Sequence, residues 1–338
     1  MMRLGVIGLG MAVKPHALSL LDLKDEVEVA ACFSPSAERR AVFAKTYGLP
    51  VVDSIDTIFD DPAINAVMVL TPPNTHLDLV RRAAATGKHI LLEKPLEITF
   101  DRSQELVETA EQAGVRLGIV LQLRFRRTVD VVSRLIPDGR FGEIVSVSMR
   151  LNNWRPQSYY DEPGRGTKAR DGGGVLLTQA IHTIDQMIAL VGLPAEVSGY
   201  AATSKVHRME TEDLVHAAMR FENGAIGALS ATTAAYPGFP DGIDILGTKG
   251  SARIDGQGAK LAFVDGTEQT ITDGMAGDGA GADPMAFSHQ NHRAVLSDFL
   301  SAIRVGRDPK VSGRQALKAH CLIDAILRAA ESGRPQSV

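Results

Sequence analysis

The sequence predicts an α/β protein whose N-terminal domain is built around a doubly wound parallel sheet. Residues 1–122 alternate short apolar stretches with helix-like stretches, the order typical of parallel strands joined by helices. A glycine turn, Gly8-Leu9-Gly10, separates the first apolar stretch from the first helix-like one. The chain has 338 residues, which is too long for one ordinary core. We therefore predict two domains, 1–122 and 123–338.

The first domain is predicted element by element from its apolar pattern and its glycines. The stretch 66–70 is wholly apolar, as expected of a strand buried on both faces. Helices at 36–47 and 76–86 end before Gly48 and Gly87, residues that commonly terminate helices. The predicted strands are 4–7, 27–32, a short one near 51, 66–70, 89–92 and 115–120, and the helices are 14–23, 36–47, 76–86 and 100–113.

The second domain is predicted to contain a long helix that is followed mainly by strands. Apolar residues at helical spacing predict a helix over about 175–191. Asn223-Gly224, between strands at 215–221 and 225–233, is a strong hairpin signal. Further strands are predicted at 243–246, 252–254 and 261–264, a Gly/Ala/Asp loop at 274–283, and closing helices at 286–304 and 314–332.

Composition excludes several classes of function. The net charge is −4 and the pI is near 6.2, so no overall positive field attracts nucleic acid or anionic membranes. No apolar run approaches the roughly 18 residues that cross a bilayer. Cys32 and Cys321 are far apart in sequence and suggest no disulfide framework. We expect a cytoplasmic protein without nucleic-acid or membrane partners.

The ends of the predicted strands form a candidate dinucleotide site, because doubly wound sheets bind ligands beyond the carboxyl ends of their strands. Gly8 allows the turn, and Gly10 lets a pyrophosphate approach a helix N-terminus. The third position of the glycine fingerprint is Val13, so the motif alone leaves a plain strand–helix turn open. The predicted cofactor-binding residues are Gly8, Gly10, Met11, Ala12, Ser34, Ser36, Arg39, Thr71, Pro72, Asn74, His76, Glu93 and Lys94.

The end of the second strand bears on the choice between NAD and NADP. An acidic residue there binds the ribose hydroxyls of NAD, whereas this chain has Ser34, with Arg39 and Arg40 one helical turn on. Arginine suits a 2′-phosphate, so the sequence slightly favours NADP. Alternatively, Ser34 before Pro35 is only a helix N-cap.

Motifs along nearly the whole chain resemble the Gfo/Idh/MocA oxidoreductases, the relatives of glucose–fructose oxidoreductase and inositol 2-dehydrogenase. Glu93-Lys94-Pro95 after the strand 89–92 is weak evidence alone, but it joins Gly8-x-Gly10 and Thr71-Pro-Pro-Asn-Thr-His76. The resemblance continues through Asp171-Gly-Gly-Gly-Val-Leu-Leu-Thr-Gln-Ala-Ile-His182-Thr-Ile-Asp185 and Asp298-Phe-Leu-x-Ala-Ile-Arg304-x-Gly306. Together these motifs are specific to the family but not to a substrate.

The resemblance implies a Rossmann domain followed by an α/β domain with a large, mostly antiparallel sheet. The open face of that sheet commonly serves oligomerisation, so a homodimer or homotetramer is expected through it. The resemblance also implies a cis bond before Pro95. It further implies that Lys94 and His182 are the catalytic residues and face the substrate beside the nicotinamide.

The implied reaction is hydride transfer between a carbinol carbon and the nicotinamide. His182 is expected to take the hydroxyl proton, since imidazole exchanges protons near neutral pH, and Lys94 to stabilise the developing charge. The opposite assignment, with Lys94 as proton carrier, stays open. Thr178 stands where many sugar and inositol dehydrogenases of the family have an acid, which puts polyol oxidation of the inositol type in doubt. Asp185 either orients His182 or lies exposed on the helix.

Substrate selection is assigned to the loop 152–168, which contains the only Trp and two of the five Tyr. Aromatic faces beside hydrogen-bond donors suit a sugar ring, and Arg suits carboxylate or phosphate. The loop is similar to that of family members acting on sugars with an acidic or nucleotide-linked group, and this resemblance makes an anionic or glycosidic carbohydrate the first choice. Docking on a neighbouring subunit is the alternative for this loop. The predicted substrate-binding residues are Lys94, Arg124, Trp154, Arg155, Tyr160, Arg165, Thr178, Gln179 and His182.

Two other functions remain open at this stage. One is a dinucleotide-sensing regulator on the same fold, which would not need Lys94 and His182. The other is a dehydrogenase of a cyclic diol from aromatic breakdown. No metal site is predicted: His289 and His292 are three residues apart on one helix, but no third ligand is evident and we expect them at the surface.

Overall fold

The computed structural model describes residues 1–273 and 288–338, and the predicted loop at 274–283 lies outside them. The chain divides into two compact units. The first contains Met1–Gln122 and His289–Leu317, and the second contains Leu123–Ser288 and Lys318–Val338. The predicted boundary after residue 122 agrees with this division. The prediction that all of 123–338 forms the second domain does not, because His289–Leu317 belongs to the first unit.

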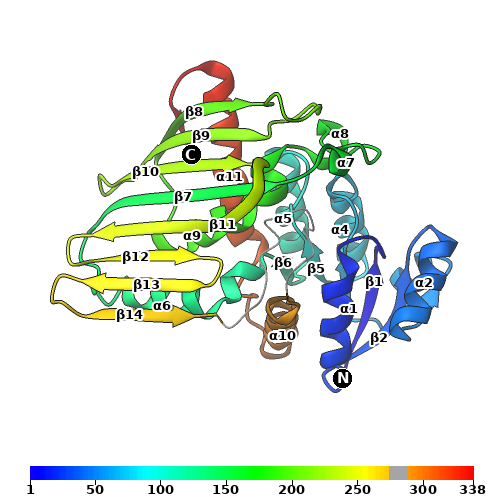
Figure 1. The fold of residues 1–338 in the computed structure, drawn as a ribbon. Helices are drawn as coiled ribbons and strands as arrows, with labels where there is room; N and C mark the ends of the chain where they lie inside the picture. Colours follow the sequence, from blue (N-terminus) through cyan, green and yellow to red (C-terminus); the bar gives the residue numbers. More distant parts are fainter. Residues whose placement is uncertain (274–287) are drawn as a thin grey trace. The chain divides into compact units, whose positions relative to one another are not determined.

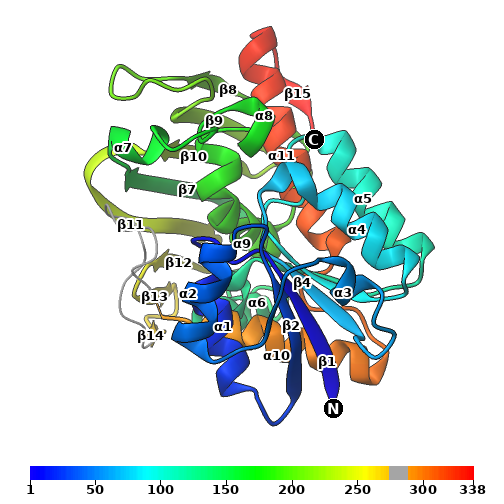
Figure 2. The same cartoon turned by 90° about the vertical axis from the view of Figure 1, so that its right-hand side faces the viewer.

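The first unit is the predicted doubly wound sheet, with strand order β3-β2-β1-β4-β5-β6 and parallel pairing throughout. Because the chain moves outward from β1 in both directions, right-handed connections put the helices on both faces. Figures 1 and 2 show this α/β arrangement. Its elements are β1 (Met2–Ile7), α1 (Val13–Asp22), β2 (Val27–Phe33), α2 (Ala37–Tyr47), β3 (Val51–Val52), α3 (Asp56–Phe59), β4 (Ala66–Val69), η1 (Pro73–Thr75), α4 (His76–Ala85), β5 (His89–Glu93), α5 (Phe100–Gln112), β6 (Leu117–Val120) and α10 (Gln290–Val305).

Helix α10 explains why a distant segment completes the first unit. Its buried stripe includes Val295, Phe299 and Leu300, and it packs against α1, β5 and β6. A Cβ on Gly118 of β6 would lie 2.9 Å from the Phe299 ring, so the absent side chain makes room for that ring. The backbone N–H of Ile119 donates to the carbonyl of Val311 at 2.9 Å. Without α10, one face of β5 and β6 would lose its apolar cover.

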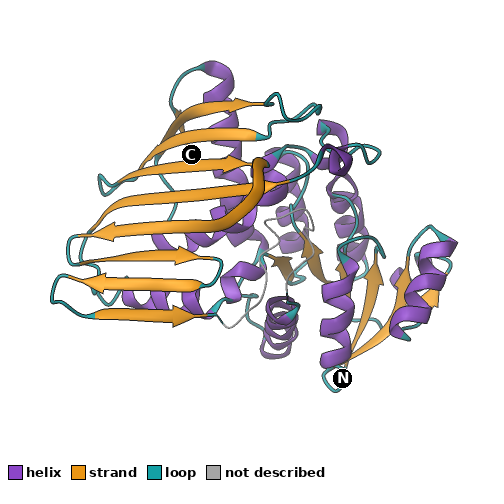
Figure 3. Ribbon diagram, in the orientation of Figure 1, coloured by secondary structure: helices purple, strands orange, loops and turns teal. Residues whose placement is uncertain are grey.

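The second unit is a nine-stranded sheet, ordered β14-β13-β12-β11-β7-β10-β9-β8-β15. Only β7 and β10 pair in parallel among its described strands, so the mostly antiparallel sheet is confirmed. Figure 3 shows its strands in orange and its helices in purple. The elements are η2 (Gln122–Phe125, at the boundary), α6 (Arg127–Leu135), β7 (Ile144–Trp154), α7 (Gln157–Tyr160), α8 (Lys168–Asp171), η3 (Leu176–Ala180), α9 (Ile181–Val191), β8 (Glu196–Ala202), β9 (Leu214–Arg220), β10 (Ile226–Thr232), β11 (Ala234–Gly247), β12 (Gly250–Asp255), β13 (Gly258–Phe263), β14 (Glu268–Thr272), α11 (Gly313–Ser332, which begins in the first unit) and β15 (Gln336–Ser337).

The core of the second unit lies between its sheet and helix α9. Helix α9 packs against β7 and β11, and Ile181, Ile184 and Ile188 are buried. The predicted hairpin is confirmed, since β9 and β10 pair antiparallel around Gly224, whose φ is 84°. The isoleucine face of α9 holds the helix against the sheet. The other face of the helix is available to carry polar side chains.

Within the described residues, one helical segment, Lys168–Val191, is long and apolar enough to cross a membrane. The sequence expectation concerned uninterrupted apolar runs, and this segment is interrupted by polar residues. Its best window has a mean hydropathy of 1.3, and 72% of that window is buried inside the protein. The segment therefore has the burial of a core helix.

Candidate active site

The predicted cofactor residues gather at the carboxyl edge of the parallel sheet. Strands β1 and β4 are neighbours from which the chain proceeds in opposite directions, so the topological switch point lies between them. The turn after β1 holds Gly8 and Gly10, and the turn after β4 holds Thr71 and Asn74. The sheet order thus brings together segments that are sixty residues apart in sequence.

The glycine turn fits a dinucleotide. Gly8 has φ of 104°, and a Cβ there would lie 2.7 Å from the backbone carbon of Leu70, so only glycine suits the position. A Cβ on Gly10 would meet nothing within 4 Å, which leaves open space beside the helix. Helix α1 begins at Val13, and its N-cap Ala12 makes no side-chain capping hydrogen bond. Val13 donates its N–H to the Gly10 carbonyl at 3.2 Å and Pro15 has no N–H, so this helix end offers a pyrophosphate the N–H of Lys14 and the positive end of the helix dipole.

The end of β2 departs from the helix-cap alternative. Ser36, not Ser34, is the N-cap of α2, and its Oγ accepts from the N–H of Arg39 at 3.2 Å. Ser34 is buried, and the N–H of Ser36 donates to its Oγ at 3.4 Å. Arg40 donates to the carbonyl of Ser34 at 2.6 Å, while Arg39 lies exposed on the first turn of α2. Arg39 is thus the guanidinium at the surface beside this strand end.

His76 connects the turns that follow β4 and β5. Its Nε2 lies 2.9 Å from the carbonyl of Thr71, and its Nδ1 lies 3.0 Å from that of Pro95 and 3.1 Å from that of Leu96. The side chain is fully buried, and burial lowers its pKa. His76 thereby holds two backbone segments together rather than presenting its ring at the surface. Pro72 and Asn74, in contrast, are exposed at the sheet edge.

The turn after β5 has the conformation that the resemblance implied. The Lys94–Pro95 peptide bond is cis. Glu93, the last residue of β5, is buried, and its Oε2 accepts from the backbone N–H of Lys94 at 2.9 Å. Lys94 itself is half-buried. The carboxylate of Glu93 therefore acts on the backbone of the predicted catalytic lysine.

In the second unit, the predicted single helix over 175–191 begins with a π-helical turn. Leu176–Ala180 is the π segment and α9 follows directly at Ile181. Such turns are rare in proteins, and those that occur are often found at functional sites. Thr178 and Gln179 lie in the π segment, and His182 follows in the first turn of α9. All three side chains are half-buried.

Glu212 holds the start of this helix and was missed by the sequence reasoning. Its carboxylate accepts from the N–H of Gly174 at 3.0 Å and from that of Leu176 at 3.2 Å. A Cβ on Gly174 would lie 1.7 Å from the carbonyl oxygen of Glu212, which explains the glycine. Burial raises the pKa of Glu212 and these N–H donors oppose that rise. The Gly-Gly-Gly segment is thus a docking point for a remote carboxylate.

Two predicted polar residues pair with each other in the interior. Arg124 donates from Nε and Nη2 to the two carboxylate oxygens of Asp185, each at 2.7 Å. Both side chains are buried. The exposed position considered for Asp185 is wrong, because its side chain is buried and both of its oxygens accept from Arg124. The Arg124 guanidinium binds Asp185 through two hydrogen bonds. A role for Arg124 in binding substrate remains a prediction.

The aromatic loop separates into a buried and a more accessible part. Tyr160 is buried with its hydroxyl 2.7 Å from Thr233 Oγ1, and the Arg155 backbone N–H donates to the Thr233 carbonyl at 2.9 Å. Tyr159, which was not among the predicted residues, accepts from Gln179 Nε2 at 3.3 Å. The Arg165 guanidinium lies 4.2 Å from the centre of the Tyr159 ring.

Trp154 lies at the end of β7, half-buried. Its ring meets that of Tyr236 edge to face, with centroids 5.4 Å apart. Tyr159 and Arg165 are both half-buried beside Gln179 of the π turn, and the Arg165 guanidinium also pairs with Glu162 at 2.6 Å. Adjacent tyrosines point in different directions here, and sequence spacing gave no means of choosing between them.

Both units match models of one protein family. The model described as "Oxidoreductase family, NAD-binding Rossmann fold" matches residues 2–120, and the Gfo/Idh/MocA C-terminal domain model matches residues 129–253. Together they account for most of the chain. The protein belongs to the Gfo/Idh/MocA family. It is accordingly an oxidoreductase acting on CH–OH groups.

Several relatives of this Gfo/Idh/MocA protein align over its whole length. An inositol 2-dehydrogenase of Rhizobium meliloti is 27% identical, with 99% of each chain covered. A 1,5-anhydro-D-fructose reductase of Ensifer adhaerens is also 27% identical, with 100% of this chain and 99% of the reductase covered. Among solved structures, the WlbA dehydrogenase of Bordetella pertussis, in complex with NADH and UDP-GlcNAcA, has a TM-score of 0.85 at 29% identity, covering 100% of this chain and 98% of WlbA.

The family protein also contains one buried group of metal-type ligands among its described residues. Donor atoms of His16, Glu93 and His292 lie within 4.8 Å of one another. The surface position expected for His292 is wrong, because its side chain is only 4% exposed. Helix α10 folds back onto α1 and thereby buries it. His289 is half-buried, with Nε2 2.9 Å from Asp22.

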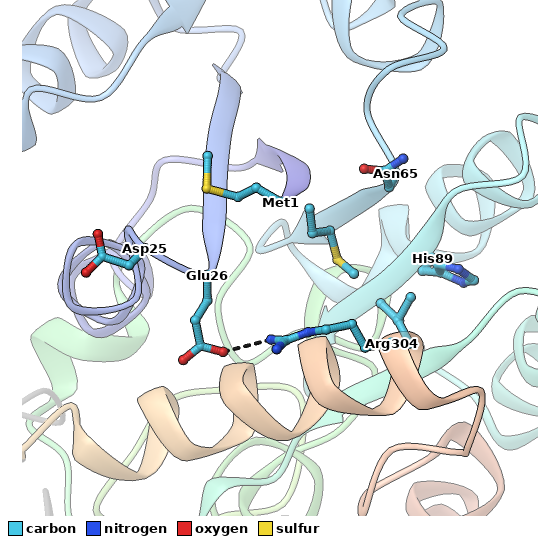
Figure 4. A pocket seen from close by; sticks show the side chains of 8 residues that line it. Met1, Asp25, Glu26, Asn65, His89 and Arg304 are labelled. Carbon is cyan, nitrogen blue, oxygen red and sulfur yellow. Dashed lines mark hydrogen bonds and ion pairs between the residues drawn. The ribbon is translucent and has the colours of Figure 1, made fainter.

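A pocket at the opposite edge of the parallel sheet is unrelated to the predicted cofactor residues. Figure 4 shows it beside the amino ends of the strands, with the Glu26–Arg304 ion pair at 2.8 Å among its lining residues. Ligands of doubly wound sheets bind at the other edge, so this pocket is not assigned to the cofactor. It is lined by Met1, Met2, Asp25, Glu26, Asn65, His89, Ile303 and Arg304.

Proposed function

We propose that this protein is an NAD(P)-dependent dehydrogenase of a sugar that carries an acidic or nucleotide-linked group. The observation that supports this most is the Gln179–Tyr159–Arg165 arrangement one turn from His182. It places an amide, a hydroxyl, an aromatic ring and a guanidinium beside the π turn, the guanidinium being paired with Glu162 at 2.6 Å. The first three suit a hydroxylated ring and the guanidinium suits an anionic group.

Two of the similar structures support this substrate class, whereas the relatives also include inositol 2-dehydrogenases, which act on a neutral polyol. The Bordetella WlbA structure is a complex with UDP-GlcNAcA, and so is that of the WlbA dehydrogenase from Chromobacterium violaceum, at 27% identity. Thr178 stands where an acid is usual in inositol dehydrogenases, and its Oγ1 donates to the carbonyl of Gly174 at 2.6 Å. A hydroxyl directed at its own backbone cannot serve as a carboxylate relay.

For the chemistry, we propose that His182 and Lys94 act on the same substrate oxygen. When bound, the nicotinamide supplies the hydride acceptor or donor. In oxidation, His182 takes the hydroxyl proton, while the Lys94 ammonium donates a hydrogen bond to the oxygen as negative charge develops. In reduction the proton returns to that oxygen from one of the two residues. Glu93 contributes by holding the backbone N–H of Lys94.

For the cofactor, we propose that the turns after β1, β2, β4 and β5 hold the dinucleotide. NADH is named in complexes of similar structures, whereas a scyllo-inositol 2-dehydrogenase of Bacillus subtilis, 27% identical over 63% of this chain, is named for NADP(+). The absence of an acid at Ser34 and the exposed Arg39 favour NADP here. Replacing Ser34 by Asp should therefore shift the NADP/NAD preference toward NAD, and an unchanged ratio would contradict this assignment.

We also propose a cytoplasmic homo-oligomer assembled through the large sheet. Outward positions on the strands of the second unit combine exposed apolar residues, Tyr200, Ile226 and Leu246, with small ones such as Ala218 and Ala228. An exposed face with such apolar residues is typical of a surface that another subunit covers. Light scattering of the purified protein tests it, and a monomer at micromolar concentration would contradict it.

The test of function begins with a fluorescence titration by NADH and NADPH, followed by a substrate panel. The panel contains UDP-linked sugar acids, free sugar acids, neutral sugars, inositols and a cyclic diol derived from an aromatic ring. Turnover confined to the anionic sugars supports the proposal, and Lys94→Ala should then remove most turnover while leaving the cofactor Kd nearly unchanged. Cofactor binding without turnover of any substrate would favour the regulatory alternative, and turnover of the diol alone would overturn the sugar assignment.

A further inference from the structure

A buried hydrogen-bond chain connects the cofactor-binding helix to the predicted catalytic lysine. His16 lies in the first turns of α1, and its Nε2 is 2.8 Å from Oε1 of Glu93. The other oxygen of Glu93 accepts from the backbone N–H of Lys94 at 2.9 Å. The His16 side chain is 3% exposed and that of Glu93 11%. Glu93 is therefore fixed from two sides, by α1 and by the turn after β5.

Helix α10 supports the same chain from behind. The rings of His16 and His292 meet edge to face, with centroids 5.1 Å apart and planes at 88°. Burial, followed by the positive charge of His16, lowers the pKa of His292 to about 3, so this ring is neutral at neutral pH. The edge-to-face contact packs the His292 ring against that of His16 and limits the ways in which the His16 ring can turn.

The carboxylate of Glu93 is ionised in this setting. Burial by itself raises its pKa, but the hydrogen bond from His16 and the positive charges of His16 and Lys94 lower it to about 2. An ionised acceptor makes both of its hydrogen bonds charge-assisted and shorter than neutral ones. A buried carboxylate that loses such a donor is strongly destabilised, so Glu93 has one well-defined position.

We propose that His16 is a positioning residue for the reaction, fixing Lys94 relative to helix α1 through Glu93. The inference rests on the proposed role of Lys94. Helix α1 starts at Val13 beside the open space at Gly10, where the pyrophosphate is proposed to bind. Two hydrogen bonds, His16–Glu93 and Lys94 N–H to Glu93, connect this end of the helix to the turn that holds Lys94. Hydride transfer requires reacting atoms about 3–3.5 Å apart, and a misplacement of about 1 Å can cost 100-fold.

A metal ion is the competing explanation of the same three residues, and the geometry argues against it. His16 Nε2 and Glu93 Oε1 are 2.8 Å apart, a hydrogen-bond distance. Two ligands of a tetrahedral zinc ion at about 2.0–2.1 Å would be roughly 3.3 Å from each other. Moreover, the second oxygen of Glu93 already accepts from a backbone N–H. The three residues are therefore arranged for hydrogen bonding and packing.

The experiment compares His16→Leu with His16→Gln, whose amide can still donate to Glu93. We expect His16→Leu to lower kcat by about 100-fold, with the NADH Kd changed less than about twofold and an increased deuterium isotope effect on kcat with carbinol-deuterated substrate. His16→Gln should recover much of the loss. The matched control is His89→Leu at the other end of β5, which should leave kcat and the isotope effect unchanged.

Several outcomes separate the inference from the proposed function. If Lys94→Ala is inactive while His16→Leu keeps wild-type kcat, the positioning role is wrong and the role of Lys94 stands. If Lys94→Ala itself keeps turnover, the proposed function fails first. The decrease in kcat of His16→Leu could instead be present in both variants and disappear when the assay temperature is lowered further below Tm. This result, with no recovery in His16→Gln, indicates a purely structural role and overturns the inference. Stoichiometric zinc in the wild-type protein that is lost in His16→Leu overturns it in favour of the metal.

Discussion

The buried pair of Arg124 and Asp185 gives a prediction that also decides between two roles for Arg124. Replacing Arg124 by Ala leaves the Asp185 carboxylate, with its side chain 1% exposed, without the guanidinium that faces both oxygens. Removing one partner of a buried ion pair costs about 3–5 kcal/mol. In a unit of this size each kcal/mol lowers Tm by about 2–4 °C. The expected decrease in Tm for Arg124→Ala is therefore on the order of 10 °C.

The assay is thermal and urea unfolding of the purified variants, with the exposed pair Arg328–Asp324 of the same unit as matched control. That pair is 2.7 Å apart with side chains 49% and 40% exposed, so Arg328→Ala should cost well under about 1 kcal/mol. The double variant R124M/D185L removes both charges and should regain most of the lost stability. An unchanged Tm in Arg124→Ala together with a raised substrate KM would refute the reasoning and restore Arg124 as a substrate ligand.

The remaining predictions concern acid stability, thiol reactivity and the start of the π turn. Because the pKa of His292 is about 3 in the folded state against 6.5 ordinarily, the unfolded chain binds an extra proton between these values. Stability should thus fall as pH drops below 6.5, by roughly 2 kcal/mol at pH 5, and His292→Leu should reduce that fall in urea titrations. Burial raises the pKa of Cys32 to about 12. A thiol reagent at pH 8 should therefore modify Cys321 slowly and Cys32 only after unfolding. Rapid modification of both cysteines in the folded protein would contradict this. Gly174→Ala should cost about 1–3 kcal/mol, since the new methyl would lie 1.7 Å from the Glu212 carbonyl oxygen, and an unaltered urea midpoint would contradict it.

The parts of the fold that the sequence predicts well are those governed by local pattern. The strand at 66–70 is buried at every position of β4, and the helix expected at 36–47 ends at Gly48 in the left-handed conformation. The Asn223-Gly224 hairpin forms as predicted. In each case the decisive information, an apolar run or a turn residue, lies within a few neighbouring positions. Short elements without such a signal, such as α3, were missed.

Polar partners are predicted poorly, because a buried charge can be matched by a residue from any part of the chain. Asp185 was placed near His182 on helical spacing, yet its partner Arg124 is 61 positions away. Glu212 lies 36 or more positions from the N–H groups that it accepts from. The apolar pattern predicts which side of α9 is buried. It does not predict which distant charged residue pairs with the polar side chains of this helix.

The boundary of the first unit shows the same dependence on distant residues and has a functional consequence. Two histidines on one helix without an evident third ligand suggested surface positions, whereas α10 completes the apolar cover of β5 and β6 and in doing so places His292 against His16. The glycine turn and the Glu93-Lys94 motif predict where the proposed cofactor and catalytic lysine lie, because those backbone conformations have a sequence signature. The residue that joins them has none: His16 is one polar position in an otherwise ordinary helix, and only the register of α1 against β5 brings its Nε2 to Glu93. Precision in placing Lys94 is therefore a property of packing between elements, and this is the property that His16→Leu and His16→Gln measure.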